Sequence, residues 1–221
     1  MGFYEDKIFP RALDIALAGA RQTRIDLVSQ ASGRVLEVGI GNGANLPFYS
    51  AKASQVVGIE PCAAMVQMAR ERLASLERQS QLALRLNQYD LQVGSGEDLP
   101  FADASFDTAI ACLVFCTIPN ADKAAQELYR VLKPGGQLLF FEHVQAAGGV
   151  KKRLQNWMNP LWKPLACGCH LNRNTQAVFK NAGFHYDTLE ATNHPRLFPL
   201  FSSVMIGSAH KETALPEPKH S

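Results

Sequence analysis

The stretch from Arg34 to Tyr49, RVLEVGIGNGANLPFY, decides the fold of this chain. A short apolar run with one acid is followed directly by three glycines at alternate positions, Gly39, Gly41 and Gly43, and then by a segment that can begin a helix. A strand, a glycine turn and a helix start are the layout of a nucleotide-binding crossover. Glycines let the backbone turn with positive φ and bring its amides close to a ligand. The stretch therefore predicts a site for a flat, polar ligand.

Glu37 separates the ligands that such a turn can bind. Sites for NAD, FAD and S-adenosylmethionine share glycine-rich turns, but here an acid lies two positions before Gly39, in a strand expected to be buried on both faces. A buried carboxylate is costly unless it is paired. It would repel a pyrophosphate, whereas the amino group of S-adenosylmethionine would neutralise it, directly or through water. The alternative is a structural acid paired with a neighbouring Lys or Arg.

Length and composition indicate one α/β domain with a small-molecule ligand. A chain of 221 residues, 47% of them hydrophobic, can bury one sizeable core. The formal charge of +2, without a long basic run, argues against a nucleic-acid partner. Five cysteines, an odd number, fit reduced thiols in a cytoplasm better than a disulfide framework. The charged N-terminal sequence resembles neither a signal peptide nor a membrane span. We therefore expect a cytoplasmic protein with no stable membrane insertion.

The domain organisation predicted from these patterns has three parts. Residues 1–33 form an amphipathic helical cap, residues 34–211 form the ligand-binding domain, and residues 212–221 form a disordered tail. A stretch rich in tryptophan and proline, near residues 150–175, predicts an insertion that borders the substrate pocket. Tyr4 and Phe9 would either reach the site or simply pack the cap onto the sheet.

Apolar runs predict about seven strands with helices on both faces, in a Rossmann-like arrangement. The expected later strands lie at residues 55–59, 91–93, 106–112, 137–141, 186–189 and 204–209. A helix over residues 121–133 is expected to stop at Pro134-Gly135-Gly136, because this sequence is typical of a helix C-terminus.

Residues at the strand ends predict the rest of the cofactor site. Glu60, about twenty residues after the glycine turn, suits the two ribose hydroxyls. Gly96 and Glu97 lie in the run from Gly94 to Phe101, which resembles the adenine-side loop of the class I S-adenosylmethionine-dependent methyltransferases. The resemblance implies that they place polar groups near the adenine edge, and an ordinary polar turn is the alternative. Leu113 and Cys116, after the fourth strand, would line the reactive end of the cofactor. Simple apolar packing is the equal alternative for these two residues.

His143 follows the fifth strand and is the best-placed general base, since an imidazole accepts a proton near neutral pH. A structural histidine with satisfied hydrogen bonds is the alternative. Positioning supplies most of the acceleration of a methyl transfer, so no obligatory acid–base pair is predicted. Cys167, Cys169 and His170 offer at most three ligands, whereas a structural zinc needs four. No metal site is predicted, and these residues are expected to form a turn beside the pocket.

The segment from Glu37 to Gly43 resembles motif I of the class I S-adenosylmethionine-dependent methyltransferases. Later runs resemble segments of the microsomal alkyl-thiol methyltransferases, which methylate hydrogen sulfide and small thiols; these runs are Gly96–Asp98, Leu113–Cys116, Phe141–Val144, Pro160–Trp162 and Gly168–Arg173. The resemblance implies S-adenosylmethionine as the cofactor and thiol S-methylation as the activity. The chain also differs from that family in one respect: the animal members carry a hydrophobic N-terminal anchor where this chain has a charged segment.

Two other functions stay open at this stage. One is C-, O- or N-methylation of another small or lipid-like acceptor, such as a quinone precursor or a phospholipid head group. The other is a protein that binds S-adenosylmethionine without turnover. Glu37 argues against a nicotinamide oxidoreductase. The sequence leaves the acceptor and the oligomeric state undetermined.

Overall fold

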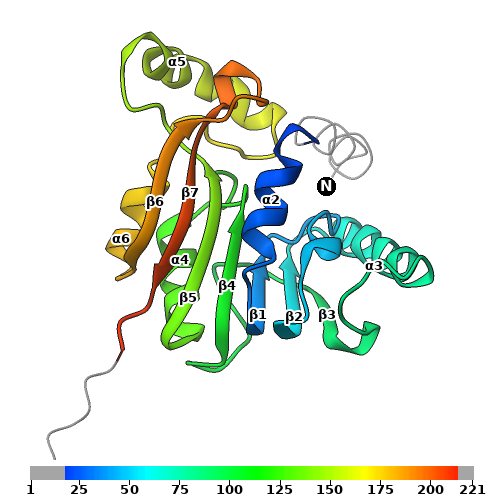
Figure 1. Ribbon diagram of the computed structural model, residues 1–221. Coiled ribbons are helices and arrows are strands. Elements are labelled where there is room, and N and C mark those ends of the chain that lie inside the picture. Colours follow the sequence, from blue (N-terminus) through cyan, green and yellow to red (C-terminus); the bar gives the residue numbers. More distant parts are fainter. Residues whose placement is uncertain (1–17, 214–221) are drawn as a thin grey trace, which may run out of the picture.

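The computed structural model describes residues 18–213, and seven strands of this part form one sheet (Figure 1). The strands are β1 Gly33–Val38, β2 Ala53–Glu60, β3 Tyr89–Val93, β4 Phe106–Cys112, β5 Leu132–His143, β6 His185–Asn193 and β7 Ser203–His210. Their order in the sheet is β3-β2-β1-β4-β5-β7-β6. Strands β1 to β5 pair in parallel, whereas β7 is antiparallel to both β5 and β6. The predicted Rossmann-like sheet is confirmed.

Helices cover both faces of this sheet because its strands are apolar on both sides. The helices are α2 Arg21–Val28, α3 Ala63–Arg78, α4 Ala121–Val131, α5 Gly149–Leu165 and α6 Thr175–Asn181. Consecutive residues of a strand point to opposite faces. Phe140 accordingly packs with Leu128 of α4 and Phe179 of α6, while Phe141 packs in the cluster that contains Val66 of α3. None of the helices within residues 18–213 combines the length and apolar character needed to cross a bilayer.

The order of the strands fixes where a ligand would bind. The chain runs outward from β1 to β2 and β3, then returns to place β4 on the other side of β1. Ligands of open α/β sheets bind beyond the carboxyl ends of the strands at such a reversal. Figure 1 shows this edge at the top of the molecule, where α5 also lies. The loops after β1, β2, β4 and β5 therefore meet on one edge.

The boundary between α4 and β5 differs from the sequence prediction. Helix α4 ends at Val131, and β5 begins at Leu132. The Pro134-Gly135-Gly136 sequence is thus an irregular part of the strand, where the β4–β5 register shifts between Phe106 and Thr108. A proline and a glycine at positive φ can form such a bulge, and the same residues can also end a helix. The sequence alone does not separate these two uses.

Helix α5 is continuous from Gly149 to Leu165, although it contains Pro160 and Pro164. A proline removes one backbone donor without necessarily ending a helix that is held elsewhere. Gln155 is fully buried and holds α5 in place, since its side chain accepts from the Ala146 amide at 2.7 Å and donates to the Leu200 carbonyl at 3.1 Å.

Three predictions concern segments that are partly or wholly outside the described residues. Tyr4, Phe9 and most of the expected cap precede residue 18, and most of the expected tail follows residue 213. Within the described part, α2 supplies the end of the cap region and packs Leu27 and Val28 into the core.

Candidate active site

Glu37 lies near the end of β1 and is only 2% exposed. Asn45 donates to one carboxylate oxygen at 2.6 Å, and the Tyr49 hydroxyl donates to the other at 2.5 Å. Arg24 of α2 donates to the Asn45 side-chain oxygen at 2.8 Å. Burial raises the pKa of Glu37, although these two donors and the Arg24 charge oppose that shift. The direct partners are thus an amide and a phenol, with the arginine one step further away.

The glycine turn after β1 has the geometry that its sequence predicts. Gly39, Gly41 and Gly43 all have positive φ, at 69°, 55° and 77°. A Cβ on Gly39 would lie 2.1 Å from a methyl carbon of Val114, so the fold itself requires glycine there. A Cβ on Gly41 would instead face open space, with its nearest neighbour 4.0 Å away. Gly41 therefore keeps a ligand-sized approach to the backbone free.

Glu60 ends β2 and lies against this turn. One carboxylate oxygen accepts from the Gly41 amide at 3.3 Å and the other from the Cys62 amide at 3.0 Å. Burial raises the pKa of Glu60, and the two backbone donors act against it. The structure thus brings the predicted ribose-binding acid and the predicted cofactor loop into direct contact.

The loop after β3 joins the same edge of the sheet. Gly96 is buried, and a Cβ there would lie 2.7 Å from a methyl carbon of Val38 in β1. Glu97 accepts from the backbone amide of Asn120 at 2.8 Å, and Asn120 caps α4 through its bond to the Lys123 amide. Glu97 therefore has a structural contact in addition to its predicted place beside the adenine.

Leu113 follows β4 in the left-handed region, with φ of 57°. Residues other than glycine rarely adopt this conformation, and strained backbone of this kind is found most often in functional loops. Glu142 of β5 holds this loop, since its buried carboxylate accepts from the amides of Val114, at 3.0 Å, and Phe115, at 3.1 Å. Burial raises the pKa of Glu142 to about 8, although these amides favour the ionised form.

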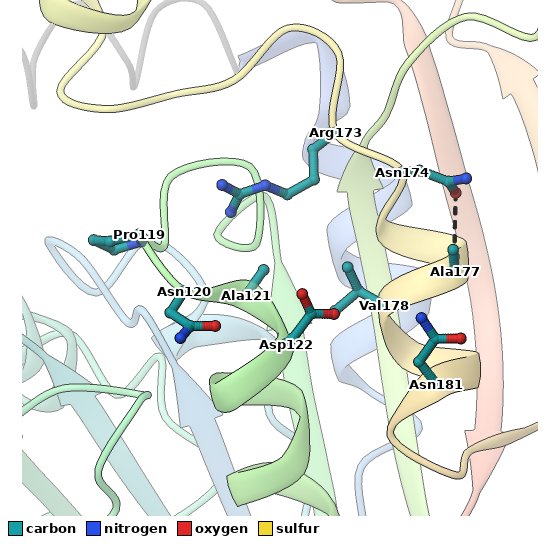
Figure 2. Close-up of a pocket in the computed structure, with 9 residues that line it drawn as sticks. All are labelled: Pro119, Asn120, Ala121, Asp122, Arg173, Asn174, Ala177, Val178 and Asn181. Carbon is teal, nitrogen blue, oxygen red and sulfur yellow. Dashed lines mark hydrogen bonds between the residues drawn. The ribbon is translucent and has the colours of Figure 1, made fainter.

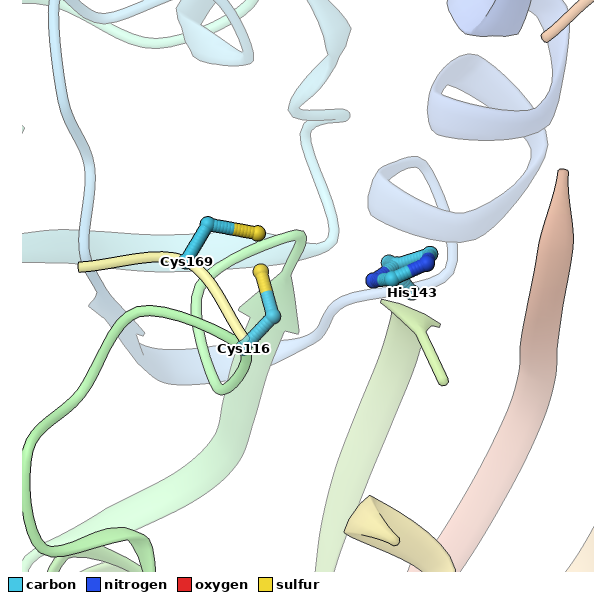
Figure 3. Close-up of side chains that lie close together, drawn as sticks. All are labelled: Cys116, His143 and Cys169. Atoms are coloured by element: carbon cyan, nitrogen blue, oxygen red, sulfur yellow. The ribbon is translucent and has the colours of Figure 1, made fainter. Parts of the chain in front are cut away.

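His143, the last residue of β5, is 5% exposed and lies beside two cysteines (Figure 3). Ligand atoms of Cys116, His143 and Cys169 lie within 4.8 Å of one another. The hydrogen bond from Cys116 lowers the pKa of the Cys169 thiol to about 5; burial opposes this shift, and His143 and Trp162 assist it. The pKa of Cys116 rises correspondingly. The hydrogen bond between the two thiols thus favours ionisation of Cys169 over ionisation of Cys116.

The segment after α5 covers the loop that follows β4. The backbone amide of His170 donates to the Cys116 carbonyl at 2.7 Å, and Arg173 donates to the carbonyls of Phe115 and Ile118. On the outer side of Arg173, a hollow of about 580 Å³ lies between the beginnings of α4 and α6 (Figure 2). Arg173 therefore both lines this hollow and donates to the loop that carries Cys116.

Sequence reasoning grouped Cys169 with the wrong neighbours. It considered Cys167, Cys169 and His170 together because they are close in the chain. In the structure the His170 ring faces the Cys116 carbonyl and Arg173, while Cys169 joins Cys116 and His143. The buried position of Glu142 was also not anticipated, although an acid inside the apolar run of residues 137–144 is a signal of the same kind as Glu37.

Comparisons with known proteins agree with this architecture. Residues 36–140 match the family model of a methyltransferase domain. Thiol S-methyltransferase TMT1B of Rattus norvegicus is 35% identical over 159 residues, which cover 71% of this chain and 62% of the relative. TMT1B of Homo sapiens is 34% identical over 178 residues, covering 78% of this chain and 69% of the relative. The chain thus spans less than two thirds of the rat protein.

More distant relatives show how varied this fold is. A phosphatidylethanolamine N-methyltransferase of Cereibacter sphaeroides is 33% identical over 138 residues, covering 61% of this chain and 64% of the relative. The crystal structure of the [4+2]-cyclase SpnF superposes with a TM-score of 0.67 at 22% identity, covering 88% of this chain and 80% of that chain. The shared fold therefore accommodates more than one chemistry.

The fold and the match to the methyltransferase family model define a class I methyltransferase domain, whose cofactor is S-adenosylmethionine. At the level of sequence, the chain belongs to the family of the TMT1 thiol S-methyltransferases.

Proposed function

We propose that this protein transfers a methyl group from S-adenosylmethionine to the sulfur of hydrogen sulfide or a small thiol. Similarity to the TMT1 relatives supports this substrate class. The observation that carries the proposal is the position of His143, a buried imidazole at the carboxyl end of β5 beside Cys169. A small sulfur acceptor suits such a site better than a large acceptor does.

The residues at the edge of the sheet fit the cofactor. The open space beside Gly41 admits a ligand against the backbone, and the buried carboxylates of Glu37 and Glu60 suit an ammonium and a ribose. Gly39, Gly43, Gly96, Glu97 and Leu113 would complete its surroundings. When bound, S-adenosylmethionine supplies an electrophilic methyl group on a sulfonium.

The protein's own contribution is to exclude water and align the acceptor. Trp162 of α5 lies against Phe201, with ring centroids 4.5 Å apart, and Phe201 is 6.2 Å from the His143 ring. These rings give the acceptor an apolar wall. Holding the acceptor in line with the methyl group can lower a reaction barrier by about 7–11 kcal/mol. His143 would accept the acceptor's proton.

The test is a methylation assay with labelled S-adenosylmethionine and a panel of acceptors: hydrogen sulfide, ethanethiol, an aryl thiol, a quinol precursor and phosphatidylethanolamine. Transfer to the thiols alone is expected. Turnover on the lipid or the quinol without transfer to thiols would contradict the substrate class. The Cereibacter relative makes phosphatidylethanolamine the second candidate.

Two variants locate the reaction within the site. Glu60→Ala is expected to abolish cofactor binding, because the carboxylate both orders the Gly41 turn and is proposed to bind the ribose. His143→Ala should bind the cofactor normally and turn over more slowly, with the largest loss for acceptors that ionise poorly. Equal loss with every acceptor would contradict a proton-accepting role.

A further inference from the structure

Cys116, His143 and Cys169 come from three separate segments of the chain: the loop after β4, the end of β5 and the turn after α5. Each side chain offers one ligand atom, and the three atoms lie within 4.8 Å of one another. Figure 3 shows the two sulfur atoms next to each other, with the imidazole ring beside them. The His170 amide and the Arg173 guanidinium donate to backbone carbonyls of the loop after β4, and these bonds hold the two cysteine-bearing segments together.

The His143 ring indicates that something belongs at the centre of this cluster. It is 95% buried, and within residues 18–213 its ring nitrogens make no hydrogen bond to a nitrogen or oxygen atom; the Cys169 thiol is the group that interacts with the ring. A buried polar group without a partner costs about 1–3 kcal/mol. A bond from a ring nitrogen to a metal ion would remove that cost, and cysteine binds metals as the thiolate.

We propose that Cys116, His143 and Cys169 bind one zinc ion, or another divalent ion with a similar preference for sulfur. Zn–S bonds of about 2.3 Å and Zn–N bonds of about 2.0–2.1 Å put tetrahedral ligand atoms roughly 3.5–3.8 Å apart. The three ligand atoms therefore need to approach by no more than about 1.3 Å from their present separations. Two sulfurs and one imidazole select zinc over magnesium or calcium, which prefer oxygen.

Three protein ligands leave the fourth tetrahedral position open, as in catalytic zinc sites. We assign this position to the sulfur of the acceptor, an assignment that rests on the proposed thiol methylation. A thiol that binds the metal loses its proton to solvent. The sulfur lone pair then forms the new bond to the methyl carbon, and the electrons of the broken bond stay on the cofactor sulfur. The product is a neutral thioether, which binds the metal weakly. This inference keeps the thiol methylation of the proposed function but replaces its proton step: His143 holds the ion, and the acceptor's proton goes to solvent instead of to the imidazole.

The first experiment titrates Co²⁺ into the reduced, metal-stripped full-length protein. One equivalent is expected to produce a thiolate-to-cobalt charge-transfer band and the visible bands of tetrahedral cobalt. The charge-transfer band should weaken in Cys116→Ser and in Cys169→Ser and disappear in the double variant. Cys167→Ser is the matched control, since Cys167 lies two residues from Cys169 but outside the cluster, and it should keep the spectrum.

Two results would overturn the metal site. One is the absence of a charge-transfer band in the reduced wild-type protein, whose fold needs no substitution for this measurement. The other is a Cys116–Cys169 disulfide that, once reduced, takes up neither Co²⁺ nor Zn²⁺; the cluster would then be a redox pair.

The second experiment adds ethanethiol to the cobalt-loaded protein. A shift of the charge-transfer band is expected when the acceptor sulfur enters the fourth position. An unchanged spectrum would overturn that assignment and leave the metal site standing. Full thiol methylation by metal-free protein would also overturn it. Metal uptake without any methylation of thiols would contradict the proposed function alone.

Discussion

At the scale of single residues, Glu37 combines a binding role with a cost in stability. Its carboxylate is buried, and its pKa is raised by that burial. A group whose pKa is raised in the folded state favours folding in acid, and this contribution is lost as the pH rises through the raised value. Above the ordinary value of 4.5, the burial of this carboxyl therefore lowers the stability of the cofactor-free protein.

We expect Glu37→Gln to raise the melting temperature of the cofactor-free protein and to weaken its binding of S-adenosylmethionine. The amide oxygen can still accept from Asn45, while the charge disappears. Each kcal/mol gained in the free energy of unfolding raises the melting temperature by about 2–4 °C. This increase should be largest at neutral pH and smallest in acid. Thermal unfolding and calorimetric titration measure the two effects. A lower melting temperature with unchanged affinity would contradict both roles.

Gly41 and Gly39 make a matched pair, since both have positive φ but only one faces open space. Gly41→Ala costs about 1–2 kcal/mol for the left-handed backbone, so the protein should still fold while its cofactor affinity falls at least about tenfold. Gly39→Ala should fail to fold, because its Cβ would overlap Val114. Circular dichroism and cofactor titration separate the two outcomes. Normal affinity in Gly41→Ala would place the cofactor elsewhere.

At the scale of elements, Glu127 and Arg130 of α4 hold the loop that carries Gly96 and Glu97. The Glu127 carboxylate accepts from the Leu99 amide at 2.9 Å, and Arg130 donates to the carbonyls of Leu99 and Phe101. The hydrogen bond from Arg130 lowers the pKa of Glu127, against a smaller opposing effect of burial. A lowered pKa favours folding above the ordinary value of 4.5, and this stability is lost as the pH falls through the lowered one.

Glu127→Gln is therefore expected to destabilise the protein by about 1–3 kcal/mol at neutral pH. The difference from wild type should shrink as the pH falls through the lowered pKa, because the wild-type carboxyl then becomes neutral too. Melting temperatures of both proteins across a pH series measure this difference in stability. Glu71→Gln, at an exposed position on α3, is the control and should change little. A constant difference at all pH values would exclude an ionic origin.

Helix α5 depends on the buried amide of Gln155, which satisfies two backbone groups at once. Gln155→Leu leaves the Ala146 amide and the Leu200 carbonyl without partners, so a loss of about 1–3 kcal/mol is expected. Because α5 carries Trp162, the KM for the acceptor should rise while cofactor affinity stays unchanged. Steady-state kinetics with both substrates measure this. Arg153→Ala, exposed on the same helix, is the control, and an equal loss of cofactor affinity would contradict the assignment of α5 to the acceptor.

At the scale of the whole molecule, local patterns predicted the sheet and the cofactor edge. Residues 34–43 signal a strand and a glycine turn without further context, and Glu60 follows at the spacing that brings it to the Gly41 amide. These features depend on neighbours in the sequence, or on the regular geometry of parallel strands. The class and the fold could therefore be predicted before the structure.

Contacts between distant loops could not be predicted in this way. Cys116, His143 and Cys169 meet because the segment after α5 folds back over the loop after β4, and no local pattern encodes that approach. The chain from Arg24 through Asn45 to Glu37 likewise needs α2 to pack over the β1 turn. Such juxtapositions arise from tertiary packing, which a single sequence does not display. The cofactor and acceptor roles of these residues remain predictions.

The burial of Glu37 and Glu60 at one edge has a consequence for proton exchange with the solvent. In the empty protein both carboxyls hold protons more tightly than free glutamate, because burial raises their pKa values. An ammonium placed beside Glu37 lowers its pKa again, so cofactor binding should release protons when the pH lies below the raised value. Affinity should then increase as the pH rises and level off above it. Calorimetry in buffers of different ionisation enthalpy counts the protons, and net uptake would contradict the contact. In that pH range, binding of the cofactor therefore also releases protons to the solvent.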